Sequence, residues 1–232
     1  MTYSYRYPRP SLTVDAVVFG LHADSDLRVL LIERGETPYR GRWALPGGFV
    51  RMDEDLPAAV RRELLEETGV APSALWQIGA FGAPERDPRG RVVSVAWTAL
   101  VRVSDHTPEA NSDAAAAAWF DINQLPDLAF DHEHILTLAR DRLSDEISRS
   151  PIAAALLPNE FTLTQWQRLH EAVVGERSDK RNFRKWAKGQ RWIEATGRRQ
   201  QGVPHRAAEL YRFVAGTEHT KNNPLVSREV EQ

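Results

Sequence analysis

The chain has 232 residues, which is enough for one large domain or two small ones, and its 42% hydrophobic and 27% charged residues are typical of a folded, water-soluble protein. It contains no cysteine, which excludes disulfides and thiolate metal sites. The longest purely apolar run, Ala114 to Phe120, is too short to cross a bilayer, and Met1 to Pro10 lacks the apolar core of a secretory signal. We therefore expect a cytoplasmic protein with no membrane partner.

The net charge of −2 conceals two oppositely charged parts. Residues 1–147 carry 15 arginines and 23 acidic residues, a net charge of −8, whereas residues 148–232 carry 15 basic and 9 acidic residues, a net charge of +6. Between Arg177 and Arg212 there are 11 basic residues and three acidic ones. A solvated surface can hold many charges, but it does not explain why the basic ones cluster. The asymmetry favours two domains with different partners.

In chain order, apolar runs predict strands at residues 13–21, 27–32, 76–81 and 92–103. Pro46-Gly47-Gly48 predicts a sharp turn between the second and third of them. A helix is expected next, with Asp55 as its N-cap, Pro57 in its first turn and Gly69 just after its end. Residues 132–147 have helical periodicity. Strands around a central helix, followed by a closing helix, indicate an α/β sandwich and not a doubly wound parallel sheet.

A second unit is expected after Ser150-Pro151, where the composition changes. Thr162 and Gln165 have the spacing of a capping box and open a helix to about residue 174. Asp179 can cap another helix to about residue 190. Residues 192–195 and 209–214 then predict a hairpin that turns at Gly197. Two helices followed by a hairpin is the order of a winged helix-turn-helix domain. Residues 215–232 are polar, and we expect a disordered tail.

One motif in the first unit is highly specific. Gly48 is followed after five residues by Glu54, and after seven more by Arg62-Glu63-Leu64-Leu65-Glu66-Glu67-Thr68-Gly69-Val70. This pattern resembles the complete Nudix signature, with nine fixed or class-restricted positions in agreement. The resemblance implies an α/β/α sandwich with a mixed sheet, spanning residues 1–149.

The spacing within the motif has a physical meaning. Glu63, Glu66 and Glu67 stand at i, i+3 and i+4, on one face of a helix, where their charges repel one another. Hard cations such as Mg²⁺ or Mn²⁺ relieve that repulsion and bridge to a pyrophosphate, so we expect these three residues to bind the metal. Glu66 and Glu67 are the candidate catalytic residues if the domain is an active enzyme. A glutamate-rich surface helix is the ordinary alternative, but it does not explain the offsets of Gly48, Glu54 and Gly69. Binding without cleavage stays open, because no general base outside the motif is identified.

Other segments resemble a particular branch of this superfamily, the Nudix-related transcriptional regulators of the NrtR family. These segments are residues 41–50, 85–95, 150–165, 179–186 and 210–213. The resemblance implies a ligand such as ADP-ribose, and a winged-helix domain at residues 150–214. Trp43 could stack on an adenine, although a core position is the better expectation. Arginines clamp diphosphates well and glycines allow close backbone approach, and the expected ligand-binding residues are Arg42, Gly47, Gly48, Arg86, Arg89 and Arg91.

The second unit has the chemistry of a duplex-binding surface. On the helix after Asp179, Phe183 and Trp186 are spaced to pack inward, which leaves the basic residues outward. A solvated basic face explains any one of these residues, but DNA binding explains the group. Residues 202–206 are less glycine-rich than in related wings. The expected DNA-binding residues are Thr164, Lys180, Arg181, Asn182, Arg184, Lys185, Lys188, Arg198, Arg199 and Arg206.

Three functions are compatible with these patterns. The first is a homodimeric repressor of NAD-metabolism genes that binds a double-stranded operator and is released by ADP-ribose or a related diphosphate. The second is a Mg²⁺-dependent ADP-ribose pyrophosphatase with an accessory basic domain. The third is a Nudix hydrolase acting on nucleic-acid ends, which the winged-helix order disfavours because that order fits duplex DNA better than RNA.

Overall fold

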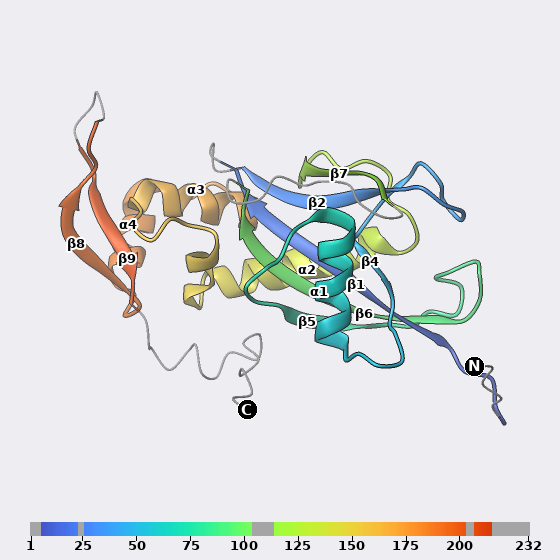
Figure 1. Ribbon diagram of the computed structural model, residues 1–232. Coiled ribbons are helices and arrows are strands. Elements are labelled where there is room, and N and C mark those ends of the chain that lie inside the picture. The colour runs from blue at the N-terminus through green and yellow to red at the C-terminus, as the bar shows by residue number, and fades with distance from the viewer. Residues whose placement is uncertain (1–5, 23–25, 104–113, 203–206, 215–232) are drawn as a thin grey trace.

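The computed structural model describes residues 6–22, 26–103, 114–202 and 207–214, and a mixed β-sheet lies at its centre (Figure 1). β1 (Ser11–Leu21) runs parallel to β6 (Val92–Arg102) along its whole length and antiparallel to β2 (Leu27–Arg34). The shorter strands extend the sheet around this centre: β3 (Trp43–Ala44) and β7 (Ala114–Asp121) pair with β2, β4 (Gly47–Phe49) with β1, and β5 (Trp76–Phe81) with β6.

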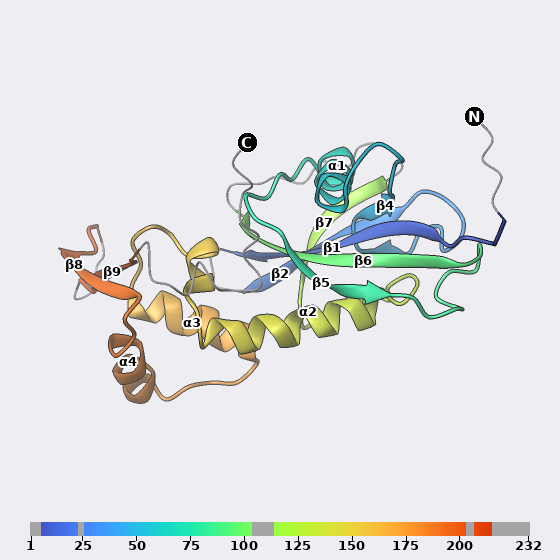
Figure 2. The same ribbon diagram turned by 90° about the horizontal axis from the view of Figure 1, so that it is seen from below.

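One long helix covers each face of the sheet, as Figure 2 shows. α1 (Leu56–Thr68) packs its apolar face against one side of β1, and α2 (His132–Ile147) packs against the other. β1 is therefore buried on both sides, and its residues from Val14 to Phe19 are inaccessible or nearly so. This is the expected consequence of a central strand between two helical layers. The predicted α/β/α sandwich with a mixed sheet is confirmed.

The ends of α1 follow the sequence signals. The Asp55 side chain accepts a hydrogen bond from the Ala58 backbone N–H at 2.8 Å, and Pro57 lies in the first turn. At the other end Gly69 adopts a left-handed conformation with φ of 69° and donates its N–H to the Leu65 carbonyl. A glycine is favoured there because a Cβ is strained at that φ.

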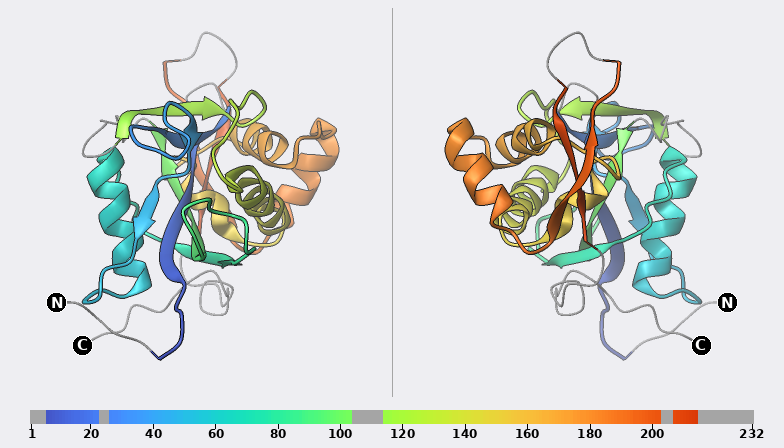
Figure 3. Two further views of the ribbon diagram at one scale, coloured as in Figure 1. Left: turned by 90° about the vertical axis from the view of Figure 1, so that its right-hand side faces the viewer. Right: turned by 90° about the vertical axis from the view of Figure 1, so that its left-hand side faces the viewer.

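The C-terminal part is a winged helix, also as predicted. A short 3₁₀ helix (Pro151–Ala155) leads to α3 (Leu163–Val174), whose capping box between Thr162 and Gln165 is complete. α4 (Lys180–Lys188) is capped by Asp179, and the hairpin β8 (Ile193–Arg199) and β9 (Glu209–Phe213) follows. In the right-hand view of Figure 3 the hairpin lies nearest the viewer, with the C-terminal helices beside it.

One predicted turn is confirmed in part and another is wrong. The chain bends at Pro46, between β3 and β4, as predicted, but Gly47 and Gly48 already belong to β4 and pair with β1. Gly197 lies inside β8, where its φ of 73° bends the strand and the register with β9 shifts. The hairpin therefore turns beyond Arg199. A further strand, β7, begins at Ala114 and was not expected, because alanines carry little strand signal. The expected tail at 215–232 lies outside the described residues.

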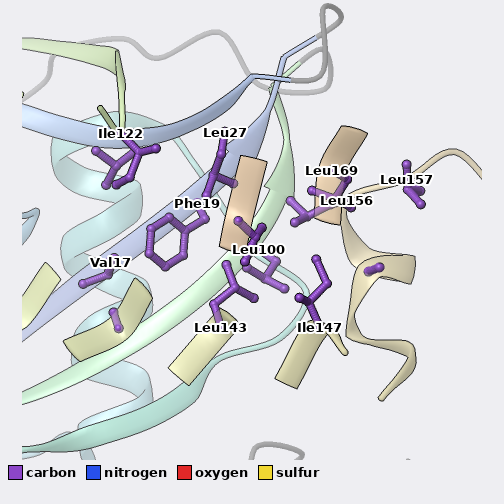
Figure 4. Close-up of a cluster of buried hydrophobic side chains, with 14 of the residues drawn as sticks. Val17, Phe19, Leu27, Leu100, Ile122, Leu143, Ile147, Leu156, Leu157 and Leu169 are labelled. Carbon is purple, nitrogen blue, oxygen red and sulfur yellow. The ribbon is translucent and has the colours of Figure 1, made fainter. Parts of the chain in front are cut away.

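The hydrophobic core is continuous between the two parts of the chain. Phe19 and Leu100 of the sheet, Ile147 of α2 and Leu169 of α3 belong to one buried cluster, which Figure 4 shows in close-up. At its C-terminal end the fully buried Trp166 contacts the aromatic rings of Phe161, Phe183, Trp186, Trp192 and Phe213. The chain boundary near residue 150 therefore does not divide the core. None of the helices among the described residues is long and apolar enough to cross a membrane.

Replacing Trp166 by alanine is predicted to lower the free energy of unfolding by about 3–5 kcal/mol, because the substitution leaves a cavity amid five aromatic rings. Urea denaturation followed by circular dichroism measures this loss. Trp166→Phe, which keeps most of the ring contacts, should lose clearly less. A loss below about 1 kcal/mol for Trp166→Ala would show that the cluster does not stabilise the fold as described.

Candidate functional site

A cleft of about 530 Å³ opens at one end of the sheet. Its walls come from β1, β2, β4 and α1, from the loop 83–90 and from the beginning of α2. Of the residues expected to bind the ligand or a metal, the lining includes Gly47, Gly48, Glu63, Glu66, Glu67, Arg86 and Arg89. The cleft has the size of a site for a small molecule, and charged groups dominate its lining.

The two glycines allow β4 to lie close to both β1 and α1. A Cβ on Gly47 would stand 2.1 Å from the Val14 carbonyl oxygen, and a Cβ on Gly48 would stand 2.6 Å from a carboxylate oxygen of Glu63. The Gly47 N–H donates to Glu67 Oε2 at 2.8 Å. The close approach of β4 therefore holds two carboxylates of α1 against the floor of the cleft.

Arg62 neutralises much of the carboxylate charge on α1. Its guanidinium donates to Glu54 at 2.6 and 2.9 Å, to Glu63 at 2.7 Å and to Glu66 at 3.0 Å. The hydrogen bonds from Arg62 lower the pKa of Glu54 to about 2, and the same contacts raise the pKa of Arg62. Glu54, Arg62 and Glu63 of the sequence motif thus form one hydrogen-bonded network, and this explains their fixed spacing.

Glu67 is the carboxylate that Arg62 does not reach within this network. Burial raises the pKa of Glu67 to about 8, and the nearby charges of Glu63 and Asp15 add to the effect, while the hydrogen bond from Gly47 opposes it. Burial also raises the pKa of Glu63, although the hydrogen bond from Arg62 works against it. Burial therefore disfavours the ionised form of Glu67, and none of the ion pairs between described residues includes it.

This donor set fits a divalent cation. Carboxylate oxygens are the ligands that hard cations prefer. A bound cation would give Glu67 a positive partner and would favour its ionised form. Such an ion would bring Lewis-acid chemistry to a diphosphate. Within the described part of the chain, no three acidic or histidine side chains are already placed as a metal cage. Ion binding would therefore require Glu63 or Glu66 to exchange its hydrogen bond with Arg62 for the metal.

The opposite wall holds a second charged network, of which the sequence analysis had named only Arg86. Asp15, on the buried strand β1, accepts hydrogen bonds from Ser94 Oγ at 2.5 Å and from Arg86 at 3.3 Å. Arg86 also donates to both carboxylate oxygens of Asp131, at 2.9 and 2.6 Å. His132 Nδ1 accepts the Leu45 backbone N–H at 2.9 Å, so its Nε2 carries the proton and faces Asp15 at 3.6 Å. Burial lowers the pKa of His132, which keeps its ring neutral.

The three arginines of the loop 83–90 and its flank do not form a common clamp. Arg86 is buried and pairs with Asp15 and Asp131. Arg89 forms an ion pair with Asp87, and its guanidinium carbon lies 5.3 and 5.6 Å from the ring centres of Phe49 and Phe130. Arg91 donates to backbone carbonyls and does not line the described cleft. Arg42 does not line it either, and its guanidinium lies over Tyr39.

Trp43 packs edge to face on Phe120, with ring centres 4.5 Å apart, and it packs against the hydrophobic core. The expectation that Trp43 is a core residue is therefore confirmed. The cleft residues that the sequence analysis missed include Asp15, Arg34, Phe130 and His132. Asp15 had a usable signal, because an acidic residue inside an otherwise apolar buried strand needs a partner. Phe130 and His132 had none, since only the fold brings the start of α2 to the cleft.

The predicted DNA-binding residues of α4 share one exposed face. Phe183 is buried and Trp186 packs on Trp166, as the spacing predicted, and Ala187 is buried as well. At 100° per residue the opposite face carries Arg184, Lys188, Arg181 and Lys185, with Lys180 and Asn182 at its borders. All six are exposed. This face has the phosphate and base-edge donors that a duplex requires.

A groove of about 320 Å³ separates α4 from the hairpin. Thr164 at the start of α3, Arg184 and Lys188 of α4 and Arg199 of β8 line it together. Lys188 lies 5.9 Å from the ring of Tyr211, and Arg198 forms an ion pair with Glu160 outside the groove. Arg206 lies outside the described residues.

Comparison with known proteins identifies both parts of the chain. Residues 11–141 match the model of the NUDIX domain, and residues 153–213 match the NrtR DNA-binding winged helix domain. An ADPR responsive transcriptional repressor of Acinetobacter baylyi is 35% identical over 212 residues, which cover 90% of this chain and 84% of that protein. The chain belongs to the NrtR family.

Solved structures of NrtR relatives support this membership. Shewanella oneidensis NrtR complexed with a 27mer DNA has a TM-score of 0.73 and 34% identity, with 88% of this chain and 93% of that chain covered. The NUDIX domain of the same protein complexed with ADP ribose has a TM-score of 0.55 and 38% identity, with 59% of this chain and 90% of that one covered. An ADP-ribose pyrophosphatase of Methanocaldococcus jannaschii is 42% identical over 130 residues, which are 56% of this NrtR-family chain and 73% of that enzyme.

Replacing Glu67 by glutamine is predicted to stabilise the protein when divalent cations are removed. The pKa of Glu67 is about 8 in the folded protein, above its ordinary value of 4.5, so the folded state binds the proton more tightly than the unfolded state does. The free energy of unfolding contributed by this group therefore falls as the pH rises from about 4.5 to about 8. In EDTA, the Tm of Glu67→Gln should exceed that of the wild type near the upper pH and converge with it near the lower one.

Differential scanning fluorimetry measures both Tm values, and Glu133→Gln, at an exposed position of α2, is the control. Adding Mg²⁺ should raise the Tm of the wild type and change that of Glu67→Gln less. An unchanged or lower Tm for Glu67→Gln across this pH range would contradict the raised pKa of the buried Glu67.

Proposed function

We propose that this chain is a homodimeric, cytoplasmic transcriptional repressor of NAD-metabolism genes, and that ADP-ribose or a related nucleoside diphosphate releases it from its operator. One observation carries the proposal. A single continuous hydrophobic core joins a cleft lined by carboxylates and arginines to an exposed basic helix face. A dimer would place two copies of α4 on half-sites about one helical turn of DNA apart, or a multiple of it.

The ligand would occupy the cleft, with Mg²⁺ or Mn²⁺ held by Glu63, Glu66 and Glu67 facing its diphosphate. Arg89 and Arg51 line the cleft with side chains that are 41% and 58% exposed, so both are open to phosphate oxygens. Arg86 is only 4% exposed and would reach a phosphate only by leaving a carboxylate partner. Release of DNA requires that the ligand bind more tightly to the geometry that does not fit the operator. Equal affinity for both geometries would leave DNA binding unchanged.

A second candidate is a Mg²⁺-dependent ADP-ribose pyrophosphatase, for which Glu66 and Glu67 would be the catalytic residues. The intact motif and the similarity to the Methanocaldococcus enzyme favour it. Against rapid turnover stands the engagement of Glu54, Glu63 and Glu66 by Arg62. A regulator that slowly destroys its own effector would combine the two functions.

Binding to the DNA upstream of the protein's own gene, measured by fluorescence anisotropy with and without ADP-ribose, tests the proposal. Hydrolysis of ADP-ribose is followed in the same samples with Mg²⁺. A specific complex that ADP-ribose dissociates, with little turnover, is the expected result. Rapid turnover without a specific complex would establish the enzyme instead and contradict the repressor.

Replacing Lys188 or Arg184 by alanine is predicted to weaken DNA binding to all sequences alike. Each substitution should reduce the slope of log K against log salt by about 1, because one phosphate contact is lost. Arg61→Ala, an exposed arginine of α1 far from the basic face, is the control and should leave the slope unchanged (Figure 1). An unchanged slope for both Lys188→Ala and Arg184→Ala would exclude α4 as the DNA-contacting helix.

A further inference from the structure

α2 connects the ligand cleft to the DNA-binding part of the molecule. Its N-terminal residue, His132, lines the cleft, and its C-terminal residue, Ile147, is buried in the same cluster as Leu169 of α3. The helix has 16 residues and is therefore about 24 Å long. Figure 2 shows it lying along the sheet, with one end beside α3. A displacement of its first turn would be transmitted to α3 as a movement of one rigid element.

The side chain of Asp131, the N-cap residue of α2, makes no capping hydrogen bond to its own helix, although the Asp131 carbonyl accepts the backbone N–H groups of His134 and Ile135. Its carboxylate instead accepts two hydrogen bonds from Arg86, at 2.9 and 2.6 Å. Aspartate at an N-cap ordinarily accepts backbone N–H groups of the first turn. Asp131 therefore has two competing sets of donors, and the structure shows it bound to Arg86.

Arg86 has competing partners as well. Besides Asp131 it contacts Asp15 at 3.3 Å, and it belongs to the loop whose Asp87 and Arg89 line the cleft. Phosphate oxygens are strong acceptors for a guanidinium and compete directly with carboxylates. A diphosphate that draws Arg86 or its loop toward the cleft removes the side-chain partner of Asp131, and the positive end of the α2 dipole then attracts the Asp131 carboxylate toward the first turn of the helix.

The backbone at this junction is also strained. Phe130, the residue before Asp131, has a φ of 55°, and it contacts Tyr39, whose φ is 62°. Such conformations are unfavourable for residues with a side chain, and they occur where the surrounding structure imposes them. The guanidinium groups of Arg34 and Arg89 lie 4.8 and 5.6 Å from the Phe130 ring, so a ligand that moves either group disturbs this residue.

At the far end of α2, Ser148 Oγ lies 2.9 Å from His170 Nε2 of α3. The His170 ring packs on Phe183 and Trp186 of α4, with ring centres 5.5 Å apart in both pairs. The C-terminus of α2 thus contacts α3 through a hydrogen bond and through Ile147, and α3 contacts the helix that carries the basic face. A continuous series of packed groups joins Asp131 to α4.

We propose that Asp131 is a positioning residue that acts through Arg86, and that exchange of the Arg86–Asp131 pair for a pair between Arg86 and the bound diphosphate moves α2 and so changes the placement of α4. This inference rests on the proposed function and specifies how the cleft regulates DNA binding. It requires two arrangements of the α2 N-terminus, one with Asp131 bound to Arg86 and one with Asp131 capping its own helix.

The test is the coupling factor, defined as the operator Kd with saturating ADP-ribose divided by the Kd without it. Anisotropy measures the operator Kd, and calorimetry measures the Kd for ADP-ribose. The wild type should show a factor within the usual range of about 5–150. Asp131→Asn should reduce the factor to about 1–2 while each Kd measured alone changes little, and Asp131→Glu, which restores the carboxylate, should recover part of it.

Glu133→Gln removes an equal charge from an exposed position of the same helical turn and should leave the factor unchanged. Ser148→Ala tests the other end of α2 independently and should lower the factor. An unchanged coupling factor in both Asp131→Asn and Ser148→Ala would overturn this inference and leave the proposed function intact. A loss of ADP-ribose binding in Asp131→Asn would overturn it too, because Asp131 would then be a binding residue. A wild-type factor of one would contradict the proposed function itself.

Discussion

The crowding of carboxylates beneath one cleft is the constraint on which the rest of the structure depends. The apolar face of α1 must pack on β1, and this packing brings Glu63 and Glu67 toward Asp15 with β4 pressed between them. Like charges at this density destabilise a folded chain unless cations relieve them. Arg62 on one side and Arg86 on the other supply internal cations, and under the proposed function a metal-bound diphosphate supplies the cation that Glu67 lacks as a partner. The stability of the fold and the chemistry of the ligand are therefore linked at the same residues.

Because the core is continuous, a change in charge pairing at the cleft affects elements that pack against the DNA-binding part of the molecule. Had the winged helix been joined only by a flexible linker, a ligand in the cleft would have no rigid route to the DNA-binding surface. Instead, Ile147 and Leu169 lie in one cluster, and the aromatic rings around Trp166 fix α3, α4 and the hairpin relative to each other. Proteins with such packed connections switch between discrete arrangements because close-packed interiors do not deform continuously.

Much of this architecture follows from the sequence, and the exceptions have physical causes. The caps of α1 and α3, at Asp55 and Thr162, are local signals and were located correctly, as was the inward packing of Phe183. The turn assigned to Gly197 was wrong because a positive φ serves a strand bend as well as a turn. The Arg86–Asp131 pair joins residues 45 positions apart, and no local pattern encodes such a contact. The sequence motif thus indicated one wall of the cleft, the family resemblance named Arg86 and Arg89 of the other, and only the fold revealed their carboxylate partners.

The most direct test of ligand-controlled DNA binding is the reciprocal affinity. Linkage requires that, if ADP-ribose weakens operator binding by some factor, bound operator weakens ADP-ribose binding by the same factor. Calorimetric titration of ADP-ribose into the protein alone and into its complex with operator DNA, in a buffer with the same salt and Mg²⁺, measures this directly. The account predicts a Kd that is higher in the complex, by the factor found from DNA binding. An identical ADP-ribose Kd with and without DNA would contradict it.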